Sequence, residues 1–223
     1  MLWNNMTKNV CKILLSVLLT AVVSFCSFAA NNVLIPKSDR VDLYDMGPGY
    51  ASEIAVAGDS YAQHFYEDEK NRGLKLYGYF NEGFTIEMNY DTLKTAFNSM
   101  QKIVFLSISV NDRHKSTHPT QFEKELRELF DIARRTGKIV LVHSYMYYDL
   151  AFAPNFPYST FEYDSMIRNL IMEYDNVYYI DMSDCTGYEY MLPDGIHYNK
   201  KFNDIMYDRV VAMIDLIGNV YYE

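Results

Sequence analysis

The sequence predicts an α/β fold, a three-layer α/β/α sandwich in which helices cover both faces of a central parallel sheet. Two observations lead to this fold class. Short apolar runs alternate along the chain with longer segments of helical periodicity, which is the pattern of parallel strands joined by crossover helices. Polar motifs follow several of these runs, as expected where parallel strands end at one edge of a sheet.

Four apolar runs are expected to form buried strands, and a fifth run predicts a strand less clearly. Short apolar runs between helical segments are typical of strands inside a parallel sheet. The weaker run is Leu74–Phe80, and the clearer four are Glu53–Ala57, Lys102–Ser109, Lys138–Ser144 and Asn176–Asp181.

Helices are expected between the strands and at the end of the chain. One helix should begin near Tyr61, directly after the first strand. Three later segments each place apolar residues on one helical face, at spacings of three and four. These faces consist of Phe122, Leu126, Leu129, Phe130 and Ala133; of Tyr163, Ile167, Leu170, Ile171 and Tyr174; and of Phe202, Ile205, Met206, Val210, Met213, Ile214 and Ile217.

Residues 1–30 have the pattern of a signal peptide. Lys8 and Lys12 form a basic start, Ile13–Phe25 is apolar, and small residues at 27–30 offer a cleavage site. The apolar stretch is shorter than the roughly 20 residues of a membrane span. We therefore expect residues 31–223 to form one domain in a secreted or cell-surface protein, without a membrane span after processing.

Cysteine and charge narrow the remaining classes of function. Cys26 leaves lipid anchoring open, although lipid-modified cysteines prefer a small residue before them and Phe25 is bulky. Cys185 is the single cysteine of the expected domain, so we expect it to be buried and to form no internal disulfide. The formal net charge is −9, and loss of Lys8 and Lys12 would change it to −11. An acidic protein repels the phosphate backbone, so we expect no nucleic-acid partner; the oligomeric state stays open.

Three short motifs in fixed order are the main indication of a catalytic site. They are Gly58-Asp59-Ser60, Ser109-Val110-Asn111-Asp112 and Asp194-Gly195-Ile196-His197. The first two follow expected strands and the third precedes the last helix, so all three can meet at one edge of the sheet.

The residue types in these motifs are those that ester hydrolysis needs. Ser60 offers a nucleophile, which needs a base to remove its proton. His197 can be that base, while Asp194 accepts a hydrogen bond from its other ring nitrogen and fixes the tautomer. The Asn111 side chain and the Ser60 backbone N–H can donate hydrogen bonds to the oxyanion.

Each of these residues also has an ordinary structural explanation. Ser60 could be a helix N-cap, His197 a surface or core histidine, and Asn111 a turn residue. We expect Asp112 to be a local turn partner of that kind. The ordinary explanations do not account for all three motifs together, because a capping serine requires neither a distant Asp-x-x-His nor an asparagine at a strand end.

The other histidines and the aromatic residues give weaker indications. His114 and His118 have a spacing that could hold a metal, but the intervening polar stretch and Pro119 favour a loop, and no third ligand is nearby in the sequence. His64 is expected on the first helix, with a role at the site entrance as the less favoured alternative. The aromatic-rich segment 145–161 could line a substrate cleft or pack on itself.

The three motifs resemble the nucleophile, Gly-x-Asn-Asp and Asp-x-x-His blocks of the SGNH, or GDSL-type, hydrolase family of esterases and lipases. The resemblance covers most of residues 31–223 in layout, but only the short blocks in identity. It implies a flavodoxin-like three-layer sandwich, catalysis by Ser60, Asp194 and His197, and no cofactor or metal.

The sequence departs from the family in two blocks. Ser109 replaces the first glycine of Gly-x-Asn-Asp, and an alignment on Asn81 puts Ile86 where the family has an oxyanion-hole glycine. The resemblance then implies an oxyanion hole made by Ser60, Asn111 and the backbone N–H of nearby Gly83.

These observations together predict an exported serine esterase that forms an acyl-enzyme on Ser60. We expect the substrate to carry O-acetyl or short acyl groups on a carbohydrate, which is either a small molecule or a polysaccharide. The expected export, the acidic charge and the lack of an obvious lipid-binding amphipathic segment favour this choice. A lipase, a thioesterase, an acyltransferase or a non-catalytic glycan-binding domain of the same fold are the alternatives.

Overall fold

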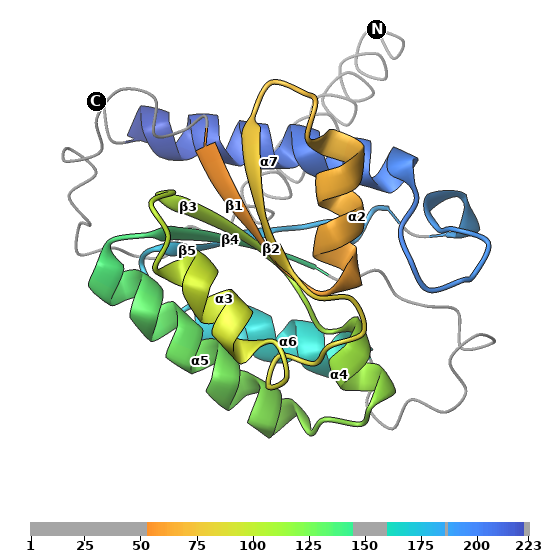
Figure 1. The fold of residues 1–223 in the computed structure, drawn as a ribbon, viewed down its shortest axis with the longest axis horizontal. Helices are drawn as coiled ribbons and strands as arrows, with labels where there is room; N and C mark the ends of the chain where they lie inside the picture. Colours follow the sequence, from red (N-terminus) through yellow and green to blue (C-terminus); the bar gives the residue numbers. More distant parts are fainter. Residues whose placement is uncertain (1–52, 145–159, 186, 221–223) are drawn as a thin grey trace, which may run out of the picture. The chain divides into compact units, whose positions relative to one another are not determined.

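Five parallel strands form the central sheet of the computed structural model, which describes residues 53–144, 160–185 and 187–220 (Figure 1). The spatial order of the strands is β2-β1-β3-β4-β5. Their bounds are Glu53–Gly58 (β1), Lys75–Phe80 (β2), Ile103–Ser107 (β3), Ile139–His143 (β4) and Val177–Ile180 (β5). All five expected strands are confirmed.

The strand that the sequence predicts least clearly lies at the edge of the sheet. β1, β3, β4 and β5 are buried along almost their whole length, whereas β2 has only Leu76 fully buried. β2 pairs with a neighbour on one side only and, unlike β5 at the other edge, exposes Lys75 and Gly78, which weaken its apolar pattern.

Helices cover both faces of the sheet, as the fold class predicts. In Figure 1, α2 and α7 lie on one side of the strands, and α3, α5 and α6 lie on the other. The helices are α2 (Ser60–Glu69), α3 (Tyr90–Phe97), α4 (Val110–His114), α5 (Pro119–Thr136), α6 (Thr160–Ile171) and α7 (Lys200–Val220), with a short 3-10 helix at Tyr188–Tyr190.

The apolar faces expected from the helical spacing form the two halves of the core. Every residue of the faces on α5, on α6 with Tyr174 just beyond it, and on α7 is buried, except Ile205, which is partly exposed. At about 25 cal/mol per Å² of buried apolar surface, such faces are the main source of stability for a domain of this size. Within the described ranges, no helix is both long enough and apolar enough to cross a membrane.

The register of the sheet brings the ends of the central strands level with one another. Gly58 at the end of β1 is paired with Phe80 of β2 on one side and with Ser107 of β3 on the other. The loops that follow these three strands therefore begin at the same edge, and they carry the first two polar motifs.

The expected signal peptide at 1–30 and most of the aromatic-rich segment, at 145–159, lie outside the described residues.

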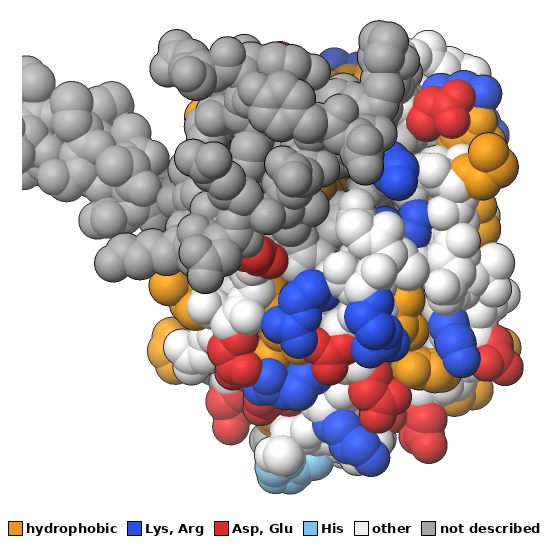
Figure 2. Space-filling model, turned by 90° about the vertical axis from the view of Figure 1, so that its left-hand side faces the viewer, with side chains coloured by type: hydrophobic (Ala, Val, Ile, Leu, Met, Phe, Trp, Pro, Cys, Tyr) orange, Lys and Arg blue, Asp and Glu red, His pale blue; other side chains and the backbone are white. Residues whose placement is uncertain are grey.

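The face of the molecule seen in Figure 2 carries lysine and arginine side chains interspersed with aspartate and glutamate. Arg127 of α5 pairs with Glu123 of the same helix and with Glu173, which follows α6. Exposed pairs of this kind contribute about 1 kcal/mol or less each.

Candidate active site

The turn from β1 into α2 places Ser60 at the first position of the helix. Gly58 has a φ of +149°, and a Cβ built on it would come 1.8 Å from the carbonyl oxygen of Ser107 on the neighbouring strand. Only glycine fits such a close approach. Asp59, not Ser60, caps the helix, because its carboxylate accepts a hydrogen bond from the Tyr61 backbone N–H at 3.0 Å. The hydroxyl of Ser60 is therefore not used for capping.

Ser60, His197 and Asp194 form a hydrogen-bonded chain. The Ser60 Oγ lies 2.9 Å from His197 Nε2, and His197 Nδ1 lies 2.7 Å from a carboxylate oxygen of Asp194. Because a carboxylate can only accept, Nδ1 carries the ring proton and Nε2 presents its lone pair to the Ser60 hydroxyl. This is the tautomer in which the imidazole can take the serine proton.

The Asp194 carboxylate also fixes the loop that carries His197. Its second oxygen accepts hydrogen bonds from the backbone N–H groups of Ile196 and His197, at 2.9 and 3.0 Å. Partial burial alone would raise the pKa of Asp194, but the hydrogen bonds from the His197 side chain and from these two N–H groups hold it below its ordinary value. Asp194 therefore stays ionised to a lower pH than an ordinary aspartate does.

Aromatic residues next to Ser60 and His197 hold these two residues together. Tyr61 follows Ser60 and Tyr198 follows His197, and their rings stack at 4.4 Å between centroids. Tyr198 also stacks on Phe202 of α7 at 3.9 Å, and the Tyr61 hydroxyl donates to the carbonyl of Ile196. These tyrosines do not stand out in the sequence; their position directly after each motif was the available signal.

Asn111 has a side-chain amide ready to donate a hydrogen bond. Its Nδ2 atom is buried and has no acceptor among the described residues. A buried donor without a partner lowers the stability of the folded protein by about 1–3 kcal/mol. Such donors often occur where a bound ligand accepts the hydrogen bond. Asn111 lies in the first turn of α4, directly after β3 and Ser109. This donor is of the type that an oxyanion hole requires.

Ser109 adopts a backbone conformation that favours glycine. Its φ is +136° with a ψ of −13°, and its N–H donates to the buried Asp59 carboxylate at 3.1 Å. Its side-chain oxygen is buried and has no hydrogen-bond partner among the described residues. The chain leaves β3 after Ser107, earlier than the apolar run suggests, because this conformation at Ser109 cannot continue a strand.

We therefore expect Ser109→Gly to raise the free energy of unfolding by about 1 kcal/mol. The change removes backbone strain of about 1–3 kcal/mol and an unpaired buried hydroxyl, which together outweigh the greater unfolded-state entropy of glycine. Urea denaturation of the variant and the wild type measures the difference. A loss of stability would show that the Ser109 side chain contributes packing that exceeds the strain.

Asp112 is not the local turn residue that the sequence suggests. Its carboxylate is buried and accepts the backbone N–H of Ile86, at 3.1 and 3.2 Å to its two oxygens, across 26 positions of the sequence. Burial, together with the nearby Asp59, raises the pKa of Asp112 to about 7 against the lowering effect of the Ile86 hydrogen bond. Burial also raises the pKa of Asp59 to about 7. Asp112 therefore fastens the loop after β2 to α4, a long-range role that local sequence does not reveal.

The loop after β2 leaves the third oxyanion donor undecided. The N–H of Ile86, at the position of the family's glycine, is already bonded to Asp112. Gly83 lies in an exposed turn with a φ of +76°, and its carbonyl accepts from Lys115 at 2.8 Å. No described contact joins Gly83 to Ser60 or Asn111. Its role in an oxyanion hole stays a prediction.

A second serine-histidine pair lies close by but has a different environment. Ser107 Oγ and His143 Nε2 are 2.8 Å apart, and His143 Nδ1 bonds the carbonyl of Ser144 at 2.7 Å. Both side chains are buried, and burial lowers the pKa of His143 to about 4. The His143 ring bonds a backbone carbonyl where His197 bonds a carboxylate, so the pair serves as a core contact between β3 and β4. His143 is buried, whereas the side chain of His197 is 21% exposed.

The other polar candidates fall into structural roles, with one exception. His114 ends α4 and His118 caps α5 through its Nδ1 atom, and the polar stretch between them forms the expected loop. No cluster of metal ligands occurs in the described part of the chain. Cys185 is buried, as expected, and burial raises the pKa of its thiol to about 11. His64, the exception, lies on α2 as expected and contacts His197 directly.

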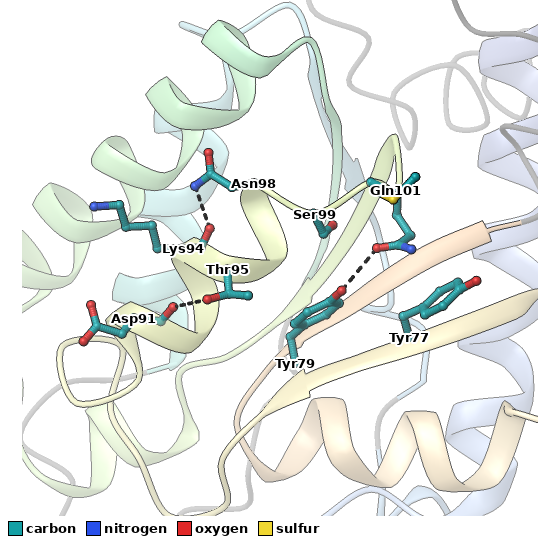
Figure 3. A pocket seen from close by; sticks show the side chains of 9 residues that line it. Tyr77, Tyr79, Asp91, Lys94, Thr95, Asn98, Ser99 and Gln101 are labelled. Carbon is teal, nitrogen blue, oxygen red and sulfur yellow. Dashed lines mark hydrogen bonds between the residues drawn. The ribbon is translucent and has the colours of Figure 1, made fainter.

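A surface groove of about 680 Å³ lies away from these residues, between β2 and α3 (Figure 3). Tyr77 and Tyr79 of β2 line one side, and the Tyr79 hydroxyl donates to Gln101 at 3.3 Å. Lys94 of α3 and Asn98, the residue that caps the end of α3, line the other side. Gln101 precedes β3, whereas Ser60 and Asn111 follow the opposite ends of the strands. The groove is therefore separate from the triad.

Comparison with known proteins supports the fold rather than a close relationship. No protein-family model matches the chain, and no curated protein matches it. Solved structures do match. A lipase/acylhydrolase from Enterococcus faecalis is 16% identical with a TM-score of 0.60, over 73% of this chain and 94% of that one.

Two further structures give the same result. A GDSL-like lipase from Bacteroides thetaiotaomicron is 12% identical with a TM-score of 0.61, over 75% of this chain and 89% of the other. The psychrotrophic esterase EstA from Pseudoalteromonas sp. is 15% identical with a TM-score of 0.57, over 74% and 99%. The expected resemblance to the SGNH family is confirmed for the fold, which is one that esterases, lipases and acylhydrolases use.

Proposed function

We propose that this protein is a serine esterase that works through an acyl-enzyme on Ser60. The observation that carries the proposal is the hydrogen-bonded chain from Ser60 through His197 to Asp194, at 2.9 and 2.7 Å. It lies on a fold that structures named as lipases and esterases share. Chain order, spacing and tautomer all fit one reaction class, acyl transfer from an ester.

The first half of the reaction forms the acyl-enzyme. Ser60 Oγ attacks the ester carbonyl carbon while its proton moves to His197 Nε2, and the carbonyl oxygen becomes an oxyanion. The Asn111 amide and the Ser60 N–H donate to that oxygen, and Gly83 is our candidate for the third donor. The intermediate then collapses, the carbon–oxygen bond to the alcohol breaks, and the alcohol leaves with the proton from His197.

The second half releases the acid. Water attacks the acyl carbon and gives its proton to His197, and the new intermediate collapses with return of that proton to Ser60. Asp194 keeps its hydrogen bond to Nδ1 throughout and stabilises the imidazolium that forms twice in each cycle. These steps need neither a metal nor a cofactor.

For the substrate, we propose O-acetyl or short acyl groups on a carbohydrate outside the cytoplasm. The signal-peptide pattern of residues 1–30 supports export, and the acidic charge makes an anionic polymer such as nucleic acid an unfavourable partner. Hydrolysis of acetylated sugars, of acyl chains of increasing length and of thioesters, with product analysis in the presence of alcohol acceptors, tests this choice. A preference for long acyl chains or thioesters would favour a lipase or thioesterase, and ester products would favour an acyltransferase.

Replacement of the proposed oxyanion donor provides a separate test of the mechanism. We expect Asn111→Ala to lower kcat for a short acyl ester by about a hundredfold or more, because it removes one donor to the oxyanion. KM and stability should change little, since Nδ2 has no partner in the described protein to lose. Steady-state kinetics with a folding check by circular dichroism measures this. An unchanged kcat would mean that Asn111 is only a turn residue.

A further inference from the structure

His64 covers one face of the proposed catalytic histidine. The ring centroids of His64 and His197 are 4.7 Å apart, and the ring planes differ by 4°, so the two imidazoles stack face to face. His64 comes four residues after Ser60 on α2, which puts both side chains on the same side of the helix. The nucleophile and the stacked ring are therefore presented to His197 by one rigid element.

The stack restrains a motion that the hydrogen bonds of His197 leave free. The bonds at Nδ1 and Nε2 fix the ring along the line through the two nitrogens. These two hydrogen bonds still allow the plane of the His197 ring to rotate about that line. Such a rotation turns the Nε2 lone pair away from the Ser60 hydroxyl. The ring of Tyr61 approaches His197 edge-on, at 6.2 Å and 86°, and does not cover its face. Among the described residues, only His64 stacks on the His197 ring.

Restraint is needed here because the pair is open to solvent. The side chains of His197 and Asp194 are 21% and 44% exposed, so packing by buried neighbours holds them less firmly than it holds a core residue. A productive geometry must be kept within fractions of an ångström, and a displacement of about 1 Å can cost a hundredfold in rate.

The charge state of His64 matters as much as its shape. Burial, and then the proximity of His197, lowers the pKa of His64, while Asp68, Glu82 and Asp194 act in the opposite direction. His64 is therefore neutral at neutral pH. A neutral ring does not oppose the positive charge that His197 gains when it takes the serine proton, whereas a cation at this distance would.

We propose that His64 is a positioning residue, which holds the plane of the His197 imidazole by stacking on it as a neutral ring. The inference rests on the proposed esterase function and adds to it a residue that touches the base rather than the substrate. Position 64 then requires a flat and neutral side chain, and an aromatic ring other than imidazole should also serve.

Three substitutions separate shape from charge. We expect His64→Ala to lower kcat for p-nitrophenyl acetate by about tenfold to a hundredfold, with KM within about twofold. His64→Phe keeps a flat neutral ring and should restore most of the lost kcat, whereas His64→Lys should be no better than alanine. The matched control is Glu67→Ala, an exposed residue of the same helix, which should leave the kinetics unchanged.

The pH profile gives a readout that loss of stability would not produce. If both imidazoles must be neutral, the acidic limb of log kcat/KM should approach a slope of two in the wild type and of one in His64→Phe. Circular dichroism across the pH range establishes that both proteins remain folded. Equal slopes of one would show that the charge of His64 does not matter and would overturn that part of the proposal.

The rate of labelling by a fluorophosphonate distinguishes failure of this inference from failure of the proposed function. Slower labelling of His64→Ala than of the wild type supports the inference. Equal labelling and equal kcat overturn it while leaving the esterase assignment intact, and a raised KM with unchanged kcat would make His64 a substrate contact instead. A wild type that is not labelled at all would overturn the proposed function and, with it, the role of His64.

Discussion

Ser60→Ala is expected to reduce ester hydrolysis by at least about 10⁴-fold, because no acyl-enzyme can form without the nucleophile. The residual rate should reflect only binding and the oxyanion donors. The fold should survive, since the change removes one oxygen atom and one hydrogen bond to His197, worth about 1 kcal/mol. Steady-state hydrolysis of p-nitrophenyl acetate and urea denaturation measure the two effects.

The buried pair of Ser107 and His143 offers a matched control for this variant. Ser107→Ala removes a serine that is also hydrogen-bonded to a histidine, but one that no substrate can reach in the described structure. It should lower stability, because His143 loses its partner, and leave the rate per folded molecule unchanged. A fall in that rate equal to the fall in Ser60→Ala would mean that the wrong serine has been assigned.

Asp194→Asn is expected to lower kcat by about 10⁴-fold, the second largest effect. An asparagine can donate a hydrogen bond to Nδ1, which would put the ring proton on Nε2, where it could no longer accept the serine proton. The substitution also removes the negative charge that stabilises the imidazolium. Kinetics normalised to folded protein measures the loss, because the same residue holds the backbone of its loop.

The pH dependence separates the roles of Asp194 and His197. The pKa of Asp194 lies below its ordinary value, so this carboxylate stays ionised above about pH 4. Protonation of Asp194 therefore does not account for a fall in wild-type activity between pH 8 and pH 5. If the Asp194→Asn variant lost stability but kept nearly the wild-type rate, Asp194 would only bridge a loop to the last helix.

The fold and the hydrogen-bonded chain from Ser60 to Asp194 were predictable because both depend on local pattern and on a general property of parallel sheets. The apolar runs defined the strands, and Ser60, at the edge where parallel strands end, lies beside the later His197 and Asp194. Boundaries were less predictable. The run at 102–109 continues to Ser109, but the positive φ of Ser109 ends the strand at Ser107.

The contacts that complete the site could not be predicted, because they join side chains from distant segments. Tyr61 stacks on Tyr198, Asp112 accepts from Ile86, and His64 covers His197. Periodicity assigns each of these residues to an element, but it does not show which residue of another element lies opposite. The helical position of His64 was correct, and its partner became visible only in three dimensions.

Covalent labelling of the wild-type protein by a fluorophosphonate tests the central claim most directly. The activated Ser60 oxygen should attack phosphorus and expel fluoride, with its proton passing to His197. We expect one adduct per protein molecule, located on the peptide that contains Ser60, and no adduct in Ser60→Ala. Folded wild-type protein that forms no adduct, or forms it on another residue, would contradict the assignment of this chain as a serine esterase acting through Ser60.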